Sequence, residues 1–237
     1  MPHRLSFRRL LRWLGLAVLG WLALSWLAVL VLRFVPPATS AVMLERRAGA
    51  WLHGERDFRL RQHWVPWSQV SPWVPLAMVA GEDQHFPYHH GFDFGAIQQA
   101  IDAADEGRRL RGASTISQQT AKNLFLWEGR SYLRKALEAY FTVLIEATWP
   151  KRRILEVYMN IAELGDGIYG VDAASRAYFH RPPAQLGPEQ AARLAAVLPS
   201  PRRLHADRPS AYVQRRADWI ERQMRQLGGP TYLRQLH

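Results

Sequence analysis

The chain has 237 residues, enough for one domain of about 200 residues and one accessory segment. It contains no cysteine, which excludes disulfide bonds and thiolate metal sites. The formal net charge is +11, but five arginines lie in the first 33 residues, which hold no acidic residue, so 26 basic and 20 acidic side chains remain beyond them. An excess of this size suits phospholipid headgroups or a pyrophosphate as well as nucleic acid, so charge alone does not identify a partner.

A membrane span is expected near the N-terminus. Leu14 to Leu32 are nineteen residues without a charge, and as a helix they would extend roughly 28 Å, enough to cross a bilayer. Four arginines precede this run and only Arg33 follows closely, so the positive-inside rule places residues 1–13 in the cytoplasm and the chain after Arg33 on the far side. Ala38-Thr39-Ser40 would suit signal-peptide cleavage, but the apolar run is longer than a usual signal core, so we interpret residues 14–35 as an uncleaved anchor.

The next part of the chain is predicted to connect the anchor to the main domain. Residues 36–64 begin with two prolines and are interpreted as a linker and membrane-proximal segment, and residues 65–237 as the main domain. Ala41 to Trp73 shows no clear periodicity, so we expect irregular structure there. Ser71-Pro72 supplies an N-cap and an N1 proline for a helix that ends at Glu82.

The remaining elements are predicted to be helices, because apolar residues recur at helical spacing. The predicted ranges are about 93–104 with Asp93 as N-cap, a segment after Gly112 with Ser114 as N-cap, 131–149, 151–163, 171–178, 188–198 and 210–227. Asp105 to Arg111 is expected to be a charged loop, and residues 165–170 form a loop with three glycines. Because no segment resembles a sheet strand, the domain is predicted to be mainly α.

Polar side chains crowd into Gly81 to Asp93, directly after an apolar run. A carboxylate at the end of a buried helix loses hydration, which raises its pKa, and chains accept that cost where function requires it. Taken alone, Glu82 and its neighbour could also be the solvated end of a helix. His85 and His89 have the spacing of a metal-binding pair, but Pro87 opposes a regular helix and no third ligand follows at familiar spacing, so no zinc site is expected.

A second group of polar residues follows at helical spacing. Thr115, Gln119 and Lys122 would place a hydroxyl, an amide and an ammonium on one helix face. Solvated faces usually favour Glu, Lys and Arg, so we interpret this face as a binding surface. Arg134 and Glu138 are four residues apart, and by themselves they would indicate an exposed salt bridge that contributes about 0.3–0.5 kcal/mol.

Two segments resemble motifs of the peptidoglycan glycosyltransferases. Residues 82–93, Glu-Asp-Gln-His-Phe-Pro-Tyr-His-His-Gly-Phe-Asp, match the first motif of that family, Glu-Asp-x-x-Phe-x-x-His-x-Gly-x-Asp, at every fixed position. Residues 112–123, Gly-Ala-Ser-Thr-Ile-Ser-Gln-Gln-Thr-Ala-Lys-Asn, resemble the second motif, Gly-Gly-Ser-Thr-x-x-Gln-Gln-x-x-Lys-Asn. Ala113 replaces a glycine there, a change that could alter the flexibility of the loop beside the substrate.

Three further segments resemble the family's other motifs in the right order. Arg134-Lys135-x-x-Glu138 resembles the third motif, and residues 154–160 and 191–201 resemble the remaining two. The likeness extends over roughly residues 65 to 205. The chain is most similar to the monofunctional, membrane-anchored members of the family.

The resemblance implies a lysozyme-like, two-lobed α fold that polymerises lipid II into β-1,4-linked glycan for the bacterial cell wall, with release of undecaprenyl diphosphate. Such an inverting transfer needs a base on the acceptor hydroxyl and electrophilic help for the diphosphate. The motifs imply Glu82 as the base that takes the proton of the acceptor's 4-hydroxyl, and Lys122 and Arg134 as the cations that neutralise the diphosphate. Glu138 matches the family's second essential glutamate, which orients Arg134 or assists at the diphosphate.

Other site residues and partners are implied in the same way. Asp83 would position the loop or hold a divalent cation, Mg²⁺ or Mn²⁺, and no organic cofactor is expected. Phe86, His89, Thr115 and Gln119 match positions that shape the substrate site. The implied partners are lipid II, the growing glycan, membrane lipid and proteins of cell division or wall synthesis, with no nucleic acid. The implied location is the bacterial inner membrane, with a single span and a periplasmic catalytic domain.

Three other classes of protein fit these residues less well. A lysozyme-type hydrolase also uses two carboxylates on a mainly α fold, but a glycan carries no diphosphate for the cationic residues to bind. A membrane-anchored scaffold would leave the polar cluster from Glu82 to Asp93 without a role. A bifunctional synthase with a penicillin-binding domain is excluded by length and by the absence of Ser-x-x-Lys.

Overall fold

The computed structural model describes residues 7–105, 114–129 and 131–236. The predicted charged loop 105–111 therefore lies almost wholly outside the described residues, as do Ala113 and the first of the N-terminal arginines, Arg4. The chain divides into two compact units, Met1–Pro36 and Pro37–His237.

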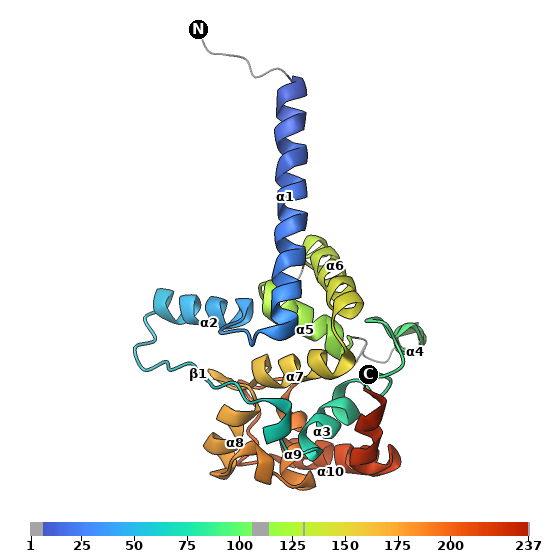
Figure 1. Ribbon diagram of the computed structural model, residues 1–237. Helices are drawn as coiled ribbons and strands as arrows, with labels where there is room; N and C mark the ends of the chain where they lie inside the picture. Colours follow the sequence, from blue (N-terminus) through green and yellow to red (C-terminus); the bar gives the residue numbers. More distant parts are fainter. Residues whose placement is uncertain (1–6, 106–113, 130, 237) are drawn as a thin grey trace. The chain divides into compact units, whose positions relative to one another are not determined.

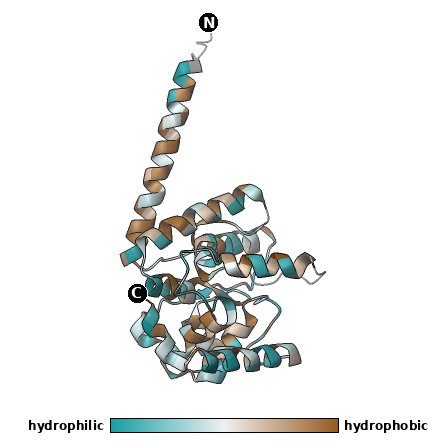
Figure 2. Ribbon diagram, turned by 90° about the vertical axis from the view of Figure 1, so that its right-hand side faces the viewer, coloured by the Kyte–Doolittle hydropathy of each residue, from teal (hydrophilic) through white to brown (hydrophobic). Residues whose placement is uncertain are grey.

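The first unit is a single long helix, α1 (Phe7–Phe34). Its residues Arg8–Phe34 include an 18-residue stretch with a mean hydropathy of 2.3 and are long and apolar enough to cross a membrane, a test that a signal sequence would also pass. Figure 2 shows that hydrophobic residues dominate this helix along most of its length. The helix includes the whole apolar run that the sequence indicated.

The second unit is mainly helical, as predicted. Its helices are α2 (Ala41–Leu52), α3 (Trp73–Glu82), α4 (Phe94–Asp105), α5 (Ile116–Phe125), α6 (Tyr132–Thr148), α7 (Lys151–Ile161), α8 (Val171–Phe179), α9 (Pro188–Val197) and α10 (Ala211–Gln226). Three short strands are added to them: β1 (Arg61–Gln62), β2 (Glu163–Gly165) and β3 (Ile168–Tyr169).

Helix α3 lies at the centre of one group of helices. Its residues from Val74 to Ala80 are all buried, because α9 and α10 pack against it. Figure 1 shows α3, α8, α9 and α10 gathered at one end of this unit and α2, α5 and α6 at the other, with α7 between the two groups. Helix α5 contacts α2, α6 and α7, so the two helices that carry the first two motifs, α3 and α5, belong to different groups.

The expectation that no sheet forms was wrong for a small part of the chain. The three strands make one sheet in the order β1-β3-β2, with β3 parallel to β1 and antiparallel to β2. Asp166 and Gly167 form the turn between β2 and β3, and Gly167 has a φ of +69°, as Asp-Gly hairpin turns require. Strands of two or three residues are too short to show an alternating pattern in the sequence.

The prediction of irregular structure from Ala41 to Trp73 was also wrong, because α2 occupies its first part. Ser40 caps this helix by accepting a hydrogen bond from the Met43 backbone N–H at 3.3 Å. Its buried residues, Val42, Met43 and Ala50, lie on one face seven or eight residues apart, but Arg46 occupies the turn between them on that face, so the sequence shows no continuous apolar stripe.

Helix ends were predicted to within about two residues. Asp93 caps α4 through the Ala96 N–H at 2.8 Å, as expected. The predicted cap Ser114 was wrong by one residue, because Thr115 caps α5. Helix α3 has no side-chain cap, so Ser71 does not have the predicted role. Helix α7 ends at Ile161 because the chain then enters β2.

Candidate active site

Glu82 is the last residue of α3, and its side chain is 15 % exposed. The Gln119 amide donates to one carboxylate oxygen at 3.1 Å, and the Arg216 guanidinium donates to the other, also at 3.1 Å. Burial raises the pKa of the Glu82 carboxyl, while the hydrogen bond from Gln119 and the charge of Arg216 act in the opposite direction. The result is a partly desolvated carboxylate held by two donors.

Tyr158 fixes the orientation of the Gln119 amide. The buried Tyr158 hydroxyl lies 3.0 Å from the Gln119 Oε1 and donates a hydrogen bond to it. Burial raises the pKa of Tyr158 well above its usual value, so the hydroxyl keeps its proton. Because the amide oxygen accepts from Tyr158, the amide nitrogen faces Glu82.

Asp83 ties the loop after α3 to the start of α5. The Ile116 N–H donates to its carboxylate at 2.9 Å. His89 accepts a hydrogen bond from the Gly91 N–H at its Nδ1 (3.1 Å), so its Nε2 carries a proton and donates to Asp83 at 3.0 Å. Phe86 is fully buried, packs edge-on against the His89 ring and lies 4.6 Å from the Lys151 ammonium. These contacts give the loop a fixed shape.

The side chains around Asp83 do not by themselves fit a divalent cation. Both Asp83 oxygens already accept hydrogen bonds from His89, and one also accepts from Ile116. Within residues 7–105, 114–129 and 131–236, no group of three or more His, Asp or Glu side chains is placed to hold a metal ion. A cation here would need most of its ligands from elsewhere.

Thr115 has a structural position, although the sequence suggested that it faces substrate. It is buried, its hydroxyl donates to the Gly91 carbonyl at 2.6 Å, and it accepts from the Gln118 N–H at 3.2 Å. Gln118 completes a capping box at this end of α5. Of the three residues predicted to form a binding face, Gln119 and Lys122 line the cleft described next, whereas Thr115 lines a smaller pocket that also contains Asp83 and Asp93.

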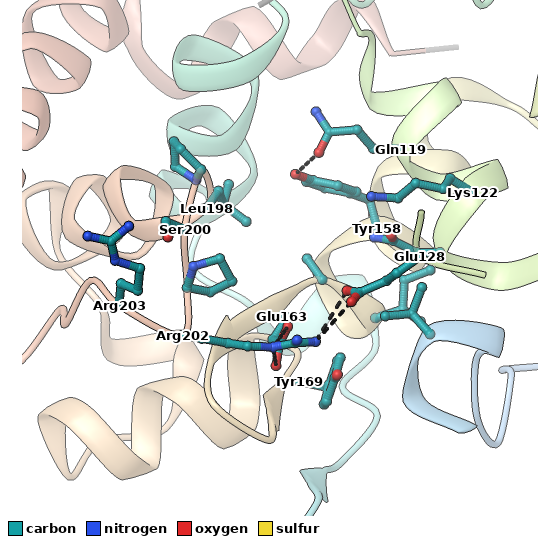
Figure 3. A pocket seen from close by; sticks show the side chains of 16 residues that line it. Gln119, Lys122, Glu128, Tyr158, Glu163, Tyr169, Leu198, Ser200, Arg202 and Arg203 are labelled. Carbon is teal, nitrogen blue, oxygen red and sulfur yellow. Dashed lines mark hydrogen bonds and ion pairs between the residues drawn. The ribbon is translucent and has the colours of Figure 1, made fainter. Parts of the chain in front are cut away.

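We call the cleft beside Lys122 the lysine cleft; it has a volume of about 420 Å³. Figure 3 shows Gln119 and Lys122 of α5 on one side of it and the segment from Leu198 to Arg203 on the other. Burial lowers the pKa of the Lys122 ammonium, and the negative charges of Glu138 and Glu128 oppose that change. The cleft therefore presents a partly desolvated cation.

Arg202 crosses one end of the lysine cleft. Its guanidinium donates to Glu128 at 3.2 Å and to Glu163 of β2 at 3.1 Å, and Figure 3 shows both contacts. These ion pairs connect the segment after α9 to the segment after α5 and to the sheet. They hold the two walls of the cleft at this end.

Arg134 and Glu138 form a buried pair. Their side chains are 11 % and 4 % exposed, and Arg134 Nη1 lies 2.7 Å from Glu138 Oε2. Lys135 pairs with the other Glu138 oxygen. The pair is therefore buried, whereas the spacing alone would suggest an exposed salt bridge. Neither Arg134 nor Glu138 is among the described residues that line the lysine cleft, but both interact electrostatically with Lys122.

The second cleft, which we call the glutamate cleft, has a volume of about 830 Å³. Its described lining residues are Ala80, Gly81, Glu82, Asp83, Gln84, Gln99, Ser114, Gln119, Pro199, Tyr212, Arg216 and Trp219. Gln119 and Pro199 line both clefts. The two clefts therefore meet at these residues, with the Glu82 carboxylate on one side and the Lys122 ammonium on the other.

Two residues of this arrangement were not singled out from the sequence. Tyr158 lies within the fourth motif, but a tyrosine on an amphipathic helix gives no signal that separates it from the core. Arg216 is one of many arginines on α10, and it contacts a residue 134 positions earlier in the chain. Only the packing of α10 on α3 distinguishes Arg216 from the other arginines of this helix.

Comparison with known proteins assigns the chain to a family. Residues 51–225 match the family model described as Transglycosylase. A protein of Xanthomonas euvesicatoria pv. vesicatoria is 57 % identical over 226 residues, which cover 95 % of this chain and 91 % of that protein. A protein of Chromohalobacter salexigens is 56 % identical over 97 % of both chains, and one of Pseudomonas entomophila is 55 % identical over 96 % of both. All three are named biosynthetic peptidoglycan transglycosylase. The chain therefore belongs to the transglycosylase family, the glycosyltransferases of peptidoglycan synthesis.

Proposed function

We propose that this chain polymerises lipid II into β-1,4-linked glycan strands, with release of undecaprenyl diphosphate, and that Glu82 is the general base. The observation that carries the assignment of the base is the position of Glu82 at the junction of the two clefts, partly desolvated and with a raised pKa. A base of raised pKa takes up a proton more readily near neutral pH than an ordinary carboxylate does.

The two clefts separate the two substrates in this mechanism. The acceptor sugar occupies the glutamate cleft, and its 4-hydroxyl gives its proton to Glu82. The acceptor oxygen then forms a bond to the anomeric carbon of the donor from the face opposite the diphosphate. The bond from that carbon to the diphosphate oxygen breaks, and the diphosphate leaves with the electron pair. The α linkage of the donor thereby becomes a β linkage in the product.

Cations on the other side of the junction assist the leaving group. Lys122 lines the lysine cleft and would neutralise charge on the departing diphosphate. Its pKa is sensitive to Glu138, which also holds Arg134 at 2.7 Å. We therefore assign Glu138 to maintaining the charge of Lys122 and the orientation of Arg134, and not to proton transfer.

The loop after α3 supports the base indirectly. Asp83, Phe86 and His89 were expected to contact substrate, but their side chains are occupied by contacts within the protein. Thr115 is likewise occupied as the cap of α5. We propose that these four residues hold the shape of the site, while Gln119 contacts both Glu82 and substrate.

We include Mg²⁺ or Mn²⁺ in the proposal only as a cation that binds together with the substrate. Since the protein side chains do not fit a cation alone, a bound cation would be held mainly by the substrate diphosphate. Polymerisation with and without a chelator would measure this requirement. A chelator that abolishes binding of the protein to a diphosphate-free glycan would contradict it.

We propose that α1 anchors the chain in the bacterial inner membrane, with a cytoplasmic N-terminus and a periplasmic catalytic unit. The support is the length and hydropathy of α1 and the arginines that precede its apolar part. A tail of undecaprenyl length cannot leave a bilayer cheaply, so membrane lipid is an expected partner, along with other proteins of wall synthesis. Reporter proteins fused after residue 36 test the orientation, since some are active only outside the cytoplasm.

The proposed function is tested by incubating the purified full-length protein with labelled lipid II and analysing the products. Lysozyme-sensitive polymer from the wild-type protein, and none from folded Glu82→Gln, is the expected result. Near-normal polymerisation by Glu82→Gln would show that another group is the base. Release of fragments from intact cell-wall material without polymer would instead indicate a hydrolase.

A further inference from the structure

Helix α10 carries a line of side chains beside its buried face. Tyr212, Arg216, Trp219 and Gln223 follow one another at spacings of four, three and four residues, so they lie along one side of the helix. We call these four residues the α10 stripe. Three of them, Tyr212, Arg216 and Trp219, line the glutamate cleft.

Contacts on both sides of Trp219 fix where this stripe lies. Arg216 donates to Glu82, and Gln223 accepts a hydrogen bond from the Gln84 amide at 3.1 Å. Trp219 lies between these two contacts on the same side of α10. Trp219 therefore lies on the side of α10 that faces the segment from Glu82 to Gln84, and it lines the glutamate cleft together with that segment.

The close packing of α10 on α3 fixes which side of α10 faces the glutamate cleft. A methyl group placed on Gly81 would lie 3.2 Å from the Ile220 side chain, so the two helices approach closely next to Glu82. Ile220 and its helical neighbours Val213, Ala217 and Met224 are buried. The helix cannot rotate about its axis without exposing that face, so Trp219 stays directed along the cleft.

Trp219 and Tyr212 are nevertheless exposed. Their exposed fractions are 39 % and 44 %, on a helix whose other exposed residues are mostly charged or polar. Large aromatic side chains that line a cleft and are not covered by protein indicate a ligand surface. The polar side chains that line the same cleft include Glu82, Arg216 and Gln99.

A pyranose ring matches this combination. One face of a hexosamine presents C–H groups that pack on an aromatic ring, while its hydroxyl and amide groups point outward to hydrogen-bonding side chains. The lysine cleft, in contrast, contains the Lys122 ammonium, which offers a setting for a diphosphate. The exposed aromatic side chains, Trp219 and Tyr212, lie in the cleft of the base, whereas the two tyrosines that line the lysine cleft are buried.

We propose that Trp219, together with Tyr212, is the surface on which the acceptor sugar stacks while Glu82 removes the proton of its 4-hydroxyl. This inference rests on the proposed function, which places the acceptor in the glutamate cleft. Trp219 acts on acceptor affinity and on the orientation of the hydroxyl. Binding of the donor, on the other side of Gln119, does not depend on it.

The test uses two lipid-linked substrates that can each have only one role. The donor is labelled lipid II whose own 4-hydroxyl is methylated, so it cannot accept. The acceptor is a lipid II analogue with a methylene group in place of the anomeric oxygen, so its diphosphate cannot leave. Formation of the labelled tetrasaccharide is followed while each substrate is varied separately, and the apparent KM for each is determined.

Trp219→Ala in the full-length protein is expected to raise the acceptor KM by about fivefold and to leave the donor KM unchanged, since stacking of this kind is worth on the order of 1 kcal/mol. Trp219→Phe should recover most of the affinity, and Tyr212→Ala should raise the acceptor KM to a smaller extent. Trp51→Ala is the matched control, because Trp51 is also exposed but lies on α2, outside the cleft.

Three results would overturn the inference: an unchanged acceptor KM in Trp219→Ala, an equal rise in both KM values, or a Trp219→Phe variant as weak as the alanine variant. The wild-type protein is first assayed with ordinary lipid II. Failure of that reaction overturns the proposed function, whereas normal polymerisation with an unaffected Trp219→Ala overturns only the role of Trp219.

Discussion

Burial and Arg216 shift the pKa of Glu82 in opposite directions, and a mutation can separate the two effects. Burial raises its pKa above the ordinary value of 4.5, and Arg216 lowers it through charge and a hydrogen bond. As the pH falls, a base of raised pKa is protonated earlier than an ordinary glutamate. The acid limb of the kcat/KM profile is therefore expected above pH 4.5 for the wild-type protein. Arg216→Gln is expected to move that limb to still higher pH, because it removes a lowering influence.

The measurement is the pH dependence of tetrasaccharide formation for the wild-type protein, Arg216→Gln and Trp51→Ala. The Trp51→Ala profile should coincide with that of the wild type. An Arg216→Gln profile of lower height but unchanged acid limb would mean that Arg216 acts only by binding substrate.

Lys122 gives a second prediction at the scale of single residues. Its pKa is lowered by burial, and the Glu138 charge raises it more than the Glu128 charge does. Removing either carboxylate should lower the Lys122 pKa further, so that Lys122 loses its proton at a lower pH. The donor KM is then expected to rise at a lower pH in Glu138→Gln than in the wild type, with a smaller change in Glu128→Gln.

The readout is the donor KM measured across the alkaline range for the three proteins. A donor KM that is raised by the same factor at every pH in Glu138→Gln would contradict an effect through the charge of Lys122. It would leave the orientation of Arg134 as the role of Glu138.

At the scale of elements, the loop between α3 and α4 depends on a glycine. Gly91 has a φ of +90°, and a methyl group placed on it would lie 2.7 Å from the Thr142 side chain of α6. Gly91→Ala is therefore expected to destabilise the protein by roughly 1–3 kcal/mol through backbone strain, with more added by the clash. It should also lower activity, because the Gly91 carbonyl accepts from the cap of α5.

Thermal unfolding of Gly91→Ala is best compared with that of Gly49→Ala. Gly49 lies within α2, has no atom within 4 Å of the added methyl group, and should gain stability from the higher helix propensity of alanine. Equal melting temperatures for the two variants would contradict the strain at Gly91.

The helices that sequence periodicity predicted correctly are those with one continuous apolar side. On α10, the buried residues Val213, Ala217, Ile220 and Met224 recur every three or four positions, and this pattern is readable without a structure. Helix α2 has no such pattern, and the strands of the sheet are shorter than any window in which alternation could be detected. Asp166-Gly167 is a sequence typical of a hairpin turn. The strands on either side of it are too short to show the alternating pattern that would have completed the prediction.

The site was predictable only where its residues are close in sequence or belong to a motif. Glu82 stood out as a carboxylate after a buried run, and Gln119 and Lys122 stood out by spacing along one helix. Arg216 and Trp219 join them only because α10 packs on α3, and no local pattern reports that packing. Thr115 shared the spacing of Gln119, but local capping chemistry determined its role instead.

At the scale of the whole molecule, the two compact units suggest that anchoring and catalysis can be separated. A variant that begins at residue 37 contains the complete second unit. In detergent it is expected to form tetrasaccharide from the single-role substrates with a rate close to that of the full-length protein. It should no longer remain with membranes after carbonate extraction. Retention in the carbonate-resistant fraction would show that the second unit holds the membrane by itself.

The wall that the two clefts share at Gln119 and Pro199 has a consequence for chain growth. In the mechanism that we propose, the new glycosidic bond forms at that wall, so the product is left with sugars in both clefts and blocks the next acceptor. It must either slide by one disaccharide or dissociate before another cycle. The length of the strands therefore depends on the ratio of the sliding rate to the dissociation rate. Weaker binding in the glutamate cleft alone would favour sliding, whereas weaker binding in both clefts would shorten the strands.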